Sequence, residues 1–164
     1  GPYLKSNKDL IDRMVNEGHI VGNHSVNHPS LPNESDKKVE SELTDLDRMF
    51  FDSYGKSMKY VRPPMGEYSE RTLAISTELG YTNVFWSVAY VDWDTKKQLG
   101  AENAYQKVTG GLHDGAVILL HAVSKDNSDA LERIIKSARE KGYIFKPLSE
   151  FNYSIPDTQN GQIT

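Results

Sequence analysis

Ala116-Val117-Ile118-Leu119-Leu120 is an unbroken apolar run that ends at His121. Consecutive apolar residues without polar alternation are typical of a parallel strand that is covered on both faces. The chain before this run repeats one arrangement, in which a helical pattern of apolar residues is followed by a short strand pattern. We therefore predict an α/β fold with a parallel sheet, where ligands gather at the carboxyl ends of the strands.

The alternation of helix and strand patterns extends along most of the chain. Serines are expected to cap several helices and glycines to end them, namely Ser6, Ser35, Ser69, Ser128, Gly18, Gly55, Gly80 and Gly142. The expected helices cover 6–18, 35–55, 69–80, 102–108 and 128–142. The expected strands cover 19–24, 59–62, 81–88, 116–120 and 143–145. We predict one domain over residues 1–151 and a polar tail over 152–164, which we expect to be disordered from Pro156 onward.

Composition excludes several classes of protein. The chain has 164 residues, of which 37% are hydrophobic, and a net charge of −4. It can build one domain with a core and is too short for two ordinary domains. The charge offers no basic field for a polyphosphate, so we expect no nucleic-acid partner. The sequence shows no membrane span and no signal-peptide pattern. The absence of cysteine excludes disulfides, thiolate ligands and a cysteine nucleophile.

A pair of histidines follows the first predicted strand. His24 and His28 lie four residues apart in Gly22-Asn23-His24-Ser25-Val26-Asn27-His28-Pro29, so both imidazoles can reach one metal ion. Such an ion needs at least one further protein ligand, usually a carboxylate, whose position is open at this point. In the alternative interpretation, both are loop histidines that hydrogen-bond to backbone groups.

Polar residues also follow the later strands, at the same edge of the expected sheet. Arg62 precedes Pro63-Pro64, Asp92 precedes Trp93, and His121 ends the apolar run. An arginine here can orient a carboxylate, and a histidine can act as an acid or base. Each also has a structural interpretation, because Arg62 could brace a turn, Asp92 could cap a helix, Trp93 could belong to the core and His121 could be a packed histidine. Their common location favours one composite site.

Four segments together resemble the polysaccharide deacetylases of carbohydrate esterase family four. They are residues 22–29, Arg62-Pro63-Pro64-Met65-Gly66, Asp92-Trp93 and Leu119-Leu120-His121. The longer strings at 17–24, 85–93 and 121–127 are similar to the subgroup that forms muramic δ-lactam in spore cortex peptidoglycan. The resemblance covers about residues 3–151. It implies a distorted (β/α) barrel and metal-dependent removal of acetyl groups from N-acetylated sugars, with zinc, cobalt, manganese or nickel as the divalent metal.

The resemblance also implies a role for individual residues. His24 and His28 would be metal ligands, and His121 would be the general acid that protonates the departing amine. Asp92 would pair with His121, and Arg62 would orient the base carboxylate. The remaining residues would contact the reacting group: the backbone N–H of Met65 would stabilise the oxyanion, and Pro64, Trp93 and Leu119 would line the substrate pocket.

The chain departs from the family pattern in its first motif. A strand ending in Thr-Phe-Asp-Asp-Gly, which carries the general base and the carboxylate ligand in this family, is absent from the 164 residues. Met65, Ala89 and Ala122 also differ from many members. We expect a barrel that lacks its first strands, inactive and unstable alone because an apolar edge is exposed. We further expect the missing N-terminal piece to be a bound partner.

Two functional hypotheses follow. In the first, the chain is part of an extracytoplasmic deacetylase that acts on peptidoglycan glycan strands, with N-acetylmuramic acid as the substrate unit and glucosamine units as the other candidate. In the second, it is a non-catalytic carbohydrate-binding remnant of the same fold. A closed structural zinc site is disfavoured because two imidazoles without cysteine make a poor tetrahedral ligand set.

Overall fold

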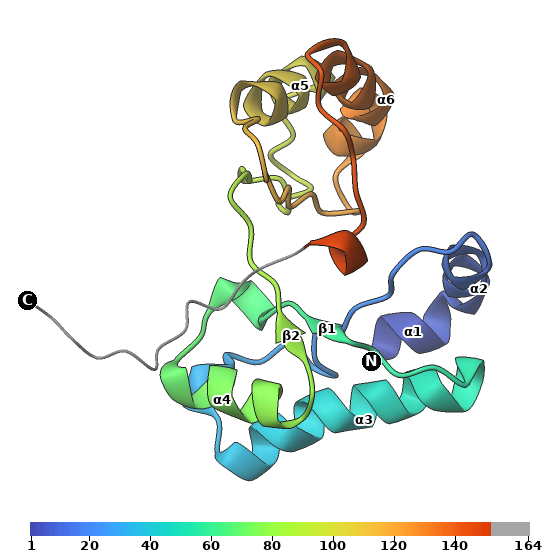
Figure 1. The fold of residues 1–164 in the computed structure, drawn as a ribbon, viewed down its shortest axis with the longest axis vertical. Helices are drawn as coiled ribbons and strands as arrows, with labels where there is room; N and C mark the ends of the chain where they lie inside the picture. The colour runs from blue at the N-terminus through green and yellow to red at the C-terminus, as the bar shows by residue number, and fades with distance from the viewer. Residues whose placement is uncertain (152–164) are drawn as a thin grey trace, which may run out of the picture.

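The computed structural model describes residues 1–151, and the predicted tail over 152–164 lies outside the described residues. Helices α1 to α4 and the two strands form one part of the molecule, and helices α5 and α6 form the other (Figure 1). The elements in chain order are α1 (Pro2–Ser6), α2 (Lys8–Asn16), η1 (Leu31–Asn33), α3 (Asp36–Tyr54), β1 (Tyr60–Val61), η2 (Pro64–Gly66), α4 (Glu70–Glu78), β2 (Thr82–Asn83), α5 (Ala101–Gly110), α6 (Lys125–Glu140) and η3 (Leu148–Glu150).

The strand pairing is parallel, as the sequence predicts, but the strands are much shorter than expected. β1 pairs with β2, and isolated parallel bridges join Asn23 to Val61 and Val88 to Ile118. The strands predicted at 19–24 and 116–120 are thus reduced to single bridges, and no strand forms at 143–145. Within the described residues, the segments around Asn23 and Ile118 each have one backbone hydrogen-bonding neighbour, whereas the segment of Val61 has two, Asn23 and β2.

The middle helices follow the sequence prediction closely. The Ser35 hydroxyl accepts a hydrogen bond from the Lys38 N–H at the start of α3, and Gly55 ends this helix at φ 64°. Ser69 and Thr72 form a reciprocal capping box at the start of α4. Because these signals act within one helical turn, the sequence alone locates both helix ends.

Two predicted caps are wrong. The Ser6 hydroxyl donates to the carbonyls of Pro2 and Tyr3, so it closes α1 from within and does not cap α2. The cap of helix α6 lies four residues before the expected Ser128, because the Ser124 hydroxyl accepts the Asn127 N–H. An earlier serine with the right spacing therefore takes the capping position.

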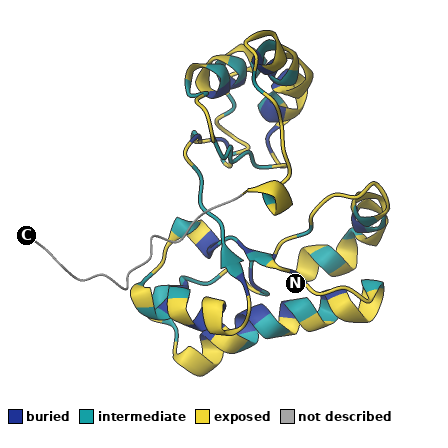
Figure 2. Ribbon diagram, in the orientation of Figure 1, coloured by how far each residue is buried: buried dark blue, intermediate teal, exposed yellow. Residues whose placement is uncertain are grey.

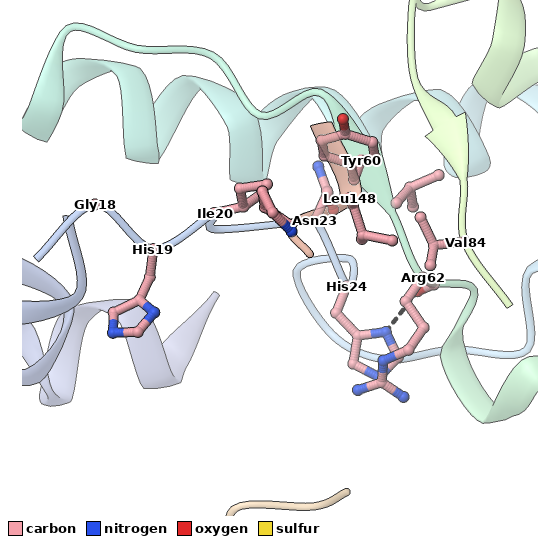
Figure 3. A pocket seen from close by; sticks show the side chains of 12 residues that line it. Gly18, His19, Ile20, Asn23, His24, Tyr60, Arg62, Val84 and Leu148 are labelled. Carbon is pink, nitrogen blue, oxygen red and sulfur yellow. Dashed lines mark hydrogen bonds between the residues drawn. The ribbon is translucent and has the colours of Figure 1, made fainter. Parts of the chain in front are cut away.

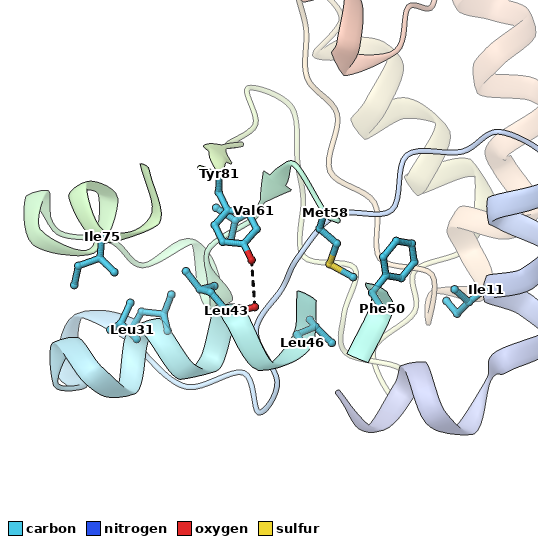
Figure 4. Close-up of a cluster of buried hydrophobic side chains, with 10 residues drawn as sticks. Ile11, Leu31, Leu43, Leu46, Phe50, Met58, Val61, Ile75 and Tyr81 are labelled. Carbon is cyan, nitrogen blue, oxygen red and sulfur yellow. Dashed lines mark hydrogen bonds between the residues drawn. The ribbon is translucent and has the colours of Figure 1, made fainter. Parts of the chain in front are cut away.

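The core consists of two hydrophobic clusters. The larger one packs α3 against the strands and extends to Ile11 of α2 and Ile75 of α4 (Figures 2 and 4). Its buried residues are Ile11, Leu31, Val39, Leu43, Leu46, Phe50, Met58, Val61, Ile75 and Tyr81. The smaller cluster joins α5 to α6 through Ala104, Val108, Ala130 and Ile134. No helix among the described residues is both long and apolar enough to cross a membrane.

The apolar run 116–120 is only half-buried, which corrects the expectation that both of its faces are covered. Together with α6 and residues 142–151, the run lines an open cavity of about 790 Å³. Ile144, on the far wall of this cavity, is 82% exposed. An apolar run in sequence therefore identifies a segment suited to burial, whereas the burial itself depends on what packs against it.

Candidate functional site

The two histidines lie close together at the end of the first bridged segment. Their ring centroids are 4.8 Å apart and the rings are nearly perpendicular. Nδ1 of His24 lies 2.6 Å from the carbonyl oxygen of Arg62. Since a carbonyl only accepts hydrogen bonds, Nδ1 carries the proton and Nε2 keeps its lone pair for a metal. Burial lowers the pKa of His24 to about 4, so the ring is neutral at pH 7, as metal ligation requires.

The loop between the histidines is fixed by a buried glutamate. The Glu42 carboxylate accepts hydrogen bonds from the Asn27 backbone N–H and from the Asn27 side-chain amide, both at 2.8 Å. Ser25 and His28 adopt left-handed conformations with φ 61° and 58°. Burial opposes the charge of Glu42, but the hydrogen bonds from Asn27 and Lys38 outweigh it and lower the pKa of this carboxyl. Helix α3 thereby holds the loop in a turn that non-glycine residues rarely adopt.

Glu42 was missed at the sequence level because it lies inside an amphipathic helix. Its position between Leu43 and Val39, on the buried face, is the one signal that could have marked it. A buried carboxylate needs hydrogen-bond donors, and here they come from a loop fifteen residues earlier.

Arg62 lies beside His24 at one wall of an open cavity of about 510 Å³ (Figure 3). Its backbone N–H donates to the Asn23 carbonyl, which anchors the end of β1. Burial lowers the pKa of the guanidinium, and the charge of Asp92 acts in the opposite direction. Within residues 1–151, the guanidinium has neither a hydrogen-bond acceptor nor a carboxylate at ion-pair distance. It is therefore available to a carboxylate from elsewhere.

The turn after β1 presents an unpaired backbone donor. Met65 has φ 58°, its side chain is 52% exposed, and no acceptor for its N–H lies within hydrogen-bonding distance in the described part of the chain. Pro64 before it is buried. A Cβ added to Gly66 would approach the Trp86 ring to 2.7 Å, so the turn packs closely against Trp86. The geometry suits an N–H that donates to an incoming oxyanion.

The C-terminal part of the site is centred on Asp92. This carboxylate is 2% exposed and accepts hydrogen bonds from His121 through Nδ1 at 2.6 Å and through the backbone N–H at 2.7 Å. The Trp93 ring is 56% exposed and meets the His121 ring edge-on, with centroids 5.8 Å apart. Leu119 is half-buried and is held by its N–H, which donates to the Val88 carbonyl. The Asp92–His121 pair leaves Nε2 as the imidazole nitrogen that can face a ligand.

Asn127 belongs to the same network and was also missed in the sequence. Its side-chain amide donates to Asp92 at 2.6 Å and to the His121 carbonyl at 3.2 Å. The Tyr90 hydroxyl donates to its oxygen. The signal that could have found it is its place in the first turn of a helix that begins directly after His121, because such a turn points back toward the preceding strand end.

The two groups of residues act on each other electrostatically. Positive charge on His121 lowers the pKa of His24, and Asp92 raises that of Arg62. His24, Arg62, Asp92 and His121, which come from both groups, are thus near enough for their charges to interact. The described residues contain no cluster of three His, Asp or Glu side chains that could hold a metal ion. The histidine pair fits a divalent metal as two imidazole nitrogen ligands and needs a third ligand to complete the site.

The polysaccharide deacetylase family model matches residues 1–84. The chain belongs to this family. Its curated relatives include an uncharacterised 30.6 kDa protein of Geobacillus stearothermophilus, 49% identical over 151 residues, and the peptidoglycan-N-acetylmuramic acid deacetylase PdaA of Bacillus subtilis, 40% identical over 154 residues. These matches cover 92% and 93% of the chain but only 57% and 59% of the relatives, so the chain spans a little more than half of their length.

Solved structures of the family have the same fold. Bacillus subtilis PdaA matches with a TM-score of 0.87 and 41% identity, over 92% of this chain and 64% of that one. A family four pseudoenzyme from Bacillus anthracis matches with a TM-score of 0.84 and 25% identity, over 92% and 52% of the two chains. Family four deacetylases fold as (β/α) barrels, and the described residues, mostly helical with few strands, correspond to part of one.

Proposed function

We propose that this chain is part of a metal-dependent deacetylase that removes acetyl groups from peptidoglycan, with N-acetylmuramic acid as the substrate unit. The observation that carries the proposal is the proximity of the His24 and His28 rings, together with a buried Asp92–His121 pair that interacts electrostatically with His24. The similarity to a peptidoglycan-N-acetylmuramic acid deacetylase supports the choice of substrate.

The metal would be zinc, cobalt, manganese or nickel, held by His24 and His28. When bound, it supplies polarisation of the amide carbonyl and a lower pKa for its water. A carboxylate from a segment outside this chain would be the third ligand, and a second one would be the base. The Arg62 guanidinium, which lacks a partner within residues 1–151, would orient that base.

The other residues act on the substrate directly. As the general acid, His121 would act in its imidazolium form: Nδ1–H donates to Asp92, and Nε2–H would give its proton to the departing amine. The Met65 N–H would donate to the developing oxyanion. Pro64, Trp93 and Leu119 would form the walls that hold the acetyl group and sugar. Peptidoglycan as substrate further implies an extracytoplasmic location, and the similarity to the δ-lactam subgroup implies a role in sporulation.

A second candidate function is carbohydrate binding without turnover. It is favoured by the structural similarity to a pseudoenzyme of the same family and by the incomplete metal ligand set in residues 1–151. In this case the imidazoles and the exposed Trp93 ring would contact the glycan, and no acetate would be released.

The test is acetate release from N-acetylated peptidoglycan by the full-length protein, as its gene encodes it, in the presence of zinc. His121→Ala is expected to lower turnover about 100-fold or more. His113→Ala is the matched control, since this exposed imidazole bonds to Ser87 away from the site. Unchanged turnover in His121→Ala would overturn the acid assignment. Glycan binding without acetate release would support the second function.

A further inference from the structure

We propose that Asn127 is a positioning residue for His121: its amide, oriented by Tyr90, holds the Asp92 carboxylate in the geometry that pairs with the imidazole. This inference rests on the proposed function, because the role of His121 as the acid does. The residue lies in the first turn of α6, at the end of the string 121–127, and the family resemblance gave it no role.

The contacts of Asn127 are those of a bridge between Asp92 and His121. The carboxylate oxygen Oδ2 of Asp92 accepts the Asn127 amide at 2.6 Å and the His121 backbone N–H at 2.7 Å. The same amide nitrogen reaches the His121 carbonyl at 3.2 Å. The Asn127 amide therefore links the Asp92 carboxylate to the backbone of His121, the residue whose imidazole pairs with that carboxylate.

Hydrogen bonds to Tyr90 and Ser124 fix the orientation of Asn127. Both protons of Nδ2 are used on Asp92 and on the His121 carbonyl, so the Tyr90 hydroxyl donates to Oδ1 and does not accept. The Asn127 N–H donates to the Ser124 hydroxyl at 3.2 Å, which fixes the first turn of α6. Asn127 is 5% exposed, so water does not replace these contacts readily.

The two oxygens of the Asp92 carboxylate therefore have different hydrogen-bond partners. Oδ2 is saturated by two N–H donors, and Oδ1 is left for Nδ1 of His121. Without Asn127, Oδ2 would lose one donor and the carboxylate could rotate about its Cβ–Cγ bond. The negative charge facing the imidazole would also be less neutralised, because one hydrogen bond to the charged form is removed.

Other charged groups near His121 are few. Asp92 faces Nδ1 directly, the Trp93 ring covers one edge, and His24 and Arg62 act on the pair electrostatically from the metal side. His24 is neutral at pH 7 and Arg62 keeps its charge, so neither changes between pH 6 and pH 8. A change in the titration of His121 in an Asn127 variant therefore reports on the carboxylate.

The experiment uses the full-length protein with Asn127→Leu, Asn127→Asp and Tyr90→Phe, and Ser128→Ala as an exposed control in the same helical turn. Asn127→Leu keeps the size but not the donors, and is expected to lower kcat about 10- to 100-fold with little change in KM. The pKa of the His121 imidazole, measured by NMR, is expected to rise by about half a unit or more in Asn127→Leu, and further in Asn127→Asp. Tyr90→Phe should have a smaller effect in the same direction.

A merely structural role predicts a different pattern. If Asn127→Leu and Asn127→Asp lower the melting temperature but leave kcat and the His121 titration as in the Ser128→Ala control, the proposal is overturned. If Asn127→Leu does not fold, Asn127→Asp and Tyr90→Phe decide the outcome by the same two readouts. If the wild-type protein releases no acetate, the proposed function fails, and the NMR titration still tests the positioning by itself.

Discussion

The two halves of the site differ in how far they are complete within residues 1–151. In the C-terminal half, the side-chain polar atoms of Asp92 and Asn127, together with Nδ1 of His121, all have partners in the described residues. In the N-terminal half, the imidazole nitrogens facing outward, the Arg62 guanidinium and the Met65 N–H do not. The C-terminal half, which contains the proposed acid His121, is thus a complete hydrogen-bond network. The N-terminal half, which contains the proposed metal ligands, has groups that can still bind other ligands.

The largest effect is expected from loss of a proposed metal ligand in the N-terminal half. His24→Ala is expected to reduce the bound metal to background and to lower acetate release about 1,000-fold or more, because one of the two proposed nitrogen ligands is removed. Metal analysis by mass spectrometry and acetate release measure the two effects in the full-length protein. His19→Ala, which removes an imidazole that is 60% exposed, is the control. Retention of one metal per chain in His24→Ala would contradict the assignment.

A change in Asp92 tests whether turnover can be lowered in the C-terminal half without a change in metal binding in the N-terminal half. Asp92→Asn is expected to lower kcat about 100-fold and the free energy of unfolding by about 1–3 kcal/mol, because the buried N–H of His121 then loses its charged acceptor. The metal content should be unchanged. Urea unfolding, turnover and metal analysis on one preparation separate these effects, and a loss of metal would mean that the halves are coupled.

Glu42 offers a test of how the histidine loop is held. Glu42→Gln is expected to lower the free energy of unfolding at pH 7 by about 1–3 kcal/mol, because one Asn27 donor is left unsatisfied. The pKa of Glu42 lies below its ordinary value of 4.5, so its stabilisation is fully present above that pH and is lost as the pH falls through the lower, folded-state pKa.

The wild-type protein should therefore lose more stability than Glu42→Gln between pH 5 and pH 3. Urea unfolding across this range provides the measurement. Glu40→Gln, an exposed change in the same helix, should behave as the wild type. Parallel pH profiles for all three proteins would mean that Glu42 does not hold the loop through its charge.

The smallest effect is expected at the turn after β1. Met65 is left-handed and half-exposed, so Met65→Gly should relieve strain and raise the free energy of unfolding by less than about 1 kcal/mol. Met14→Gly, inside helix α2, should lower it by about 1 kcal/mol. Thermal melts of both variants test whether the two changes in stability have opposite signs. A loss of stability in Met65→Gly would show that the contacts of the methionine side chain stabilise the turn by more than the strain costs.

Local signals in the sequence located the middle helices well. The predicted ranges 35–55, 69–80 and 102–108 agree with α3, α4 and α5 to within two residues at each end. For α3 and α4 the reason is that capping serines and terminal glycines act within one turn. The strands were predicted too long, since a strand needs hydrogen-bonding partners that are distant in sequence. The cap of α6 was misplaced because two serines compete within four residues.

The sequence by itself determined the residue types of the site and their common edge, since His24, Arg62, Asp92 and His121 all follow segments with strand character. Tertiary structure alone revealed Glu42 and Asn127, two buried polar side chains on the inner faces of α3 and α6. The physical reason is that a helix pattern shows which face is buried, whereas the donor or acceptor that satisfies a buried polar group comes from another element. The histidine loop and the Asp92–His121 pair therefore owe their geometry to helices whose role no local pattern could indicate.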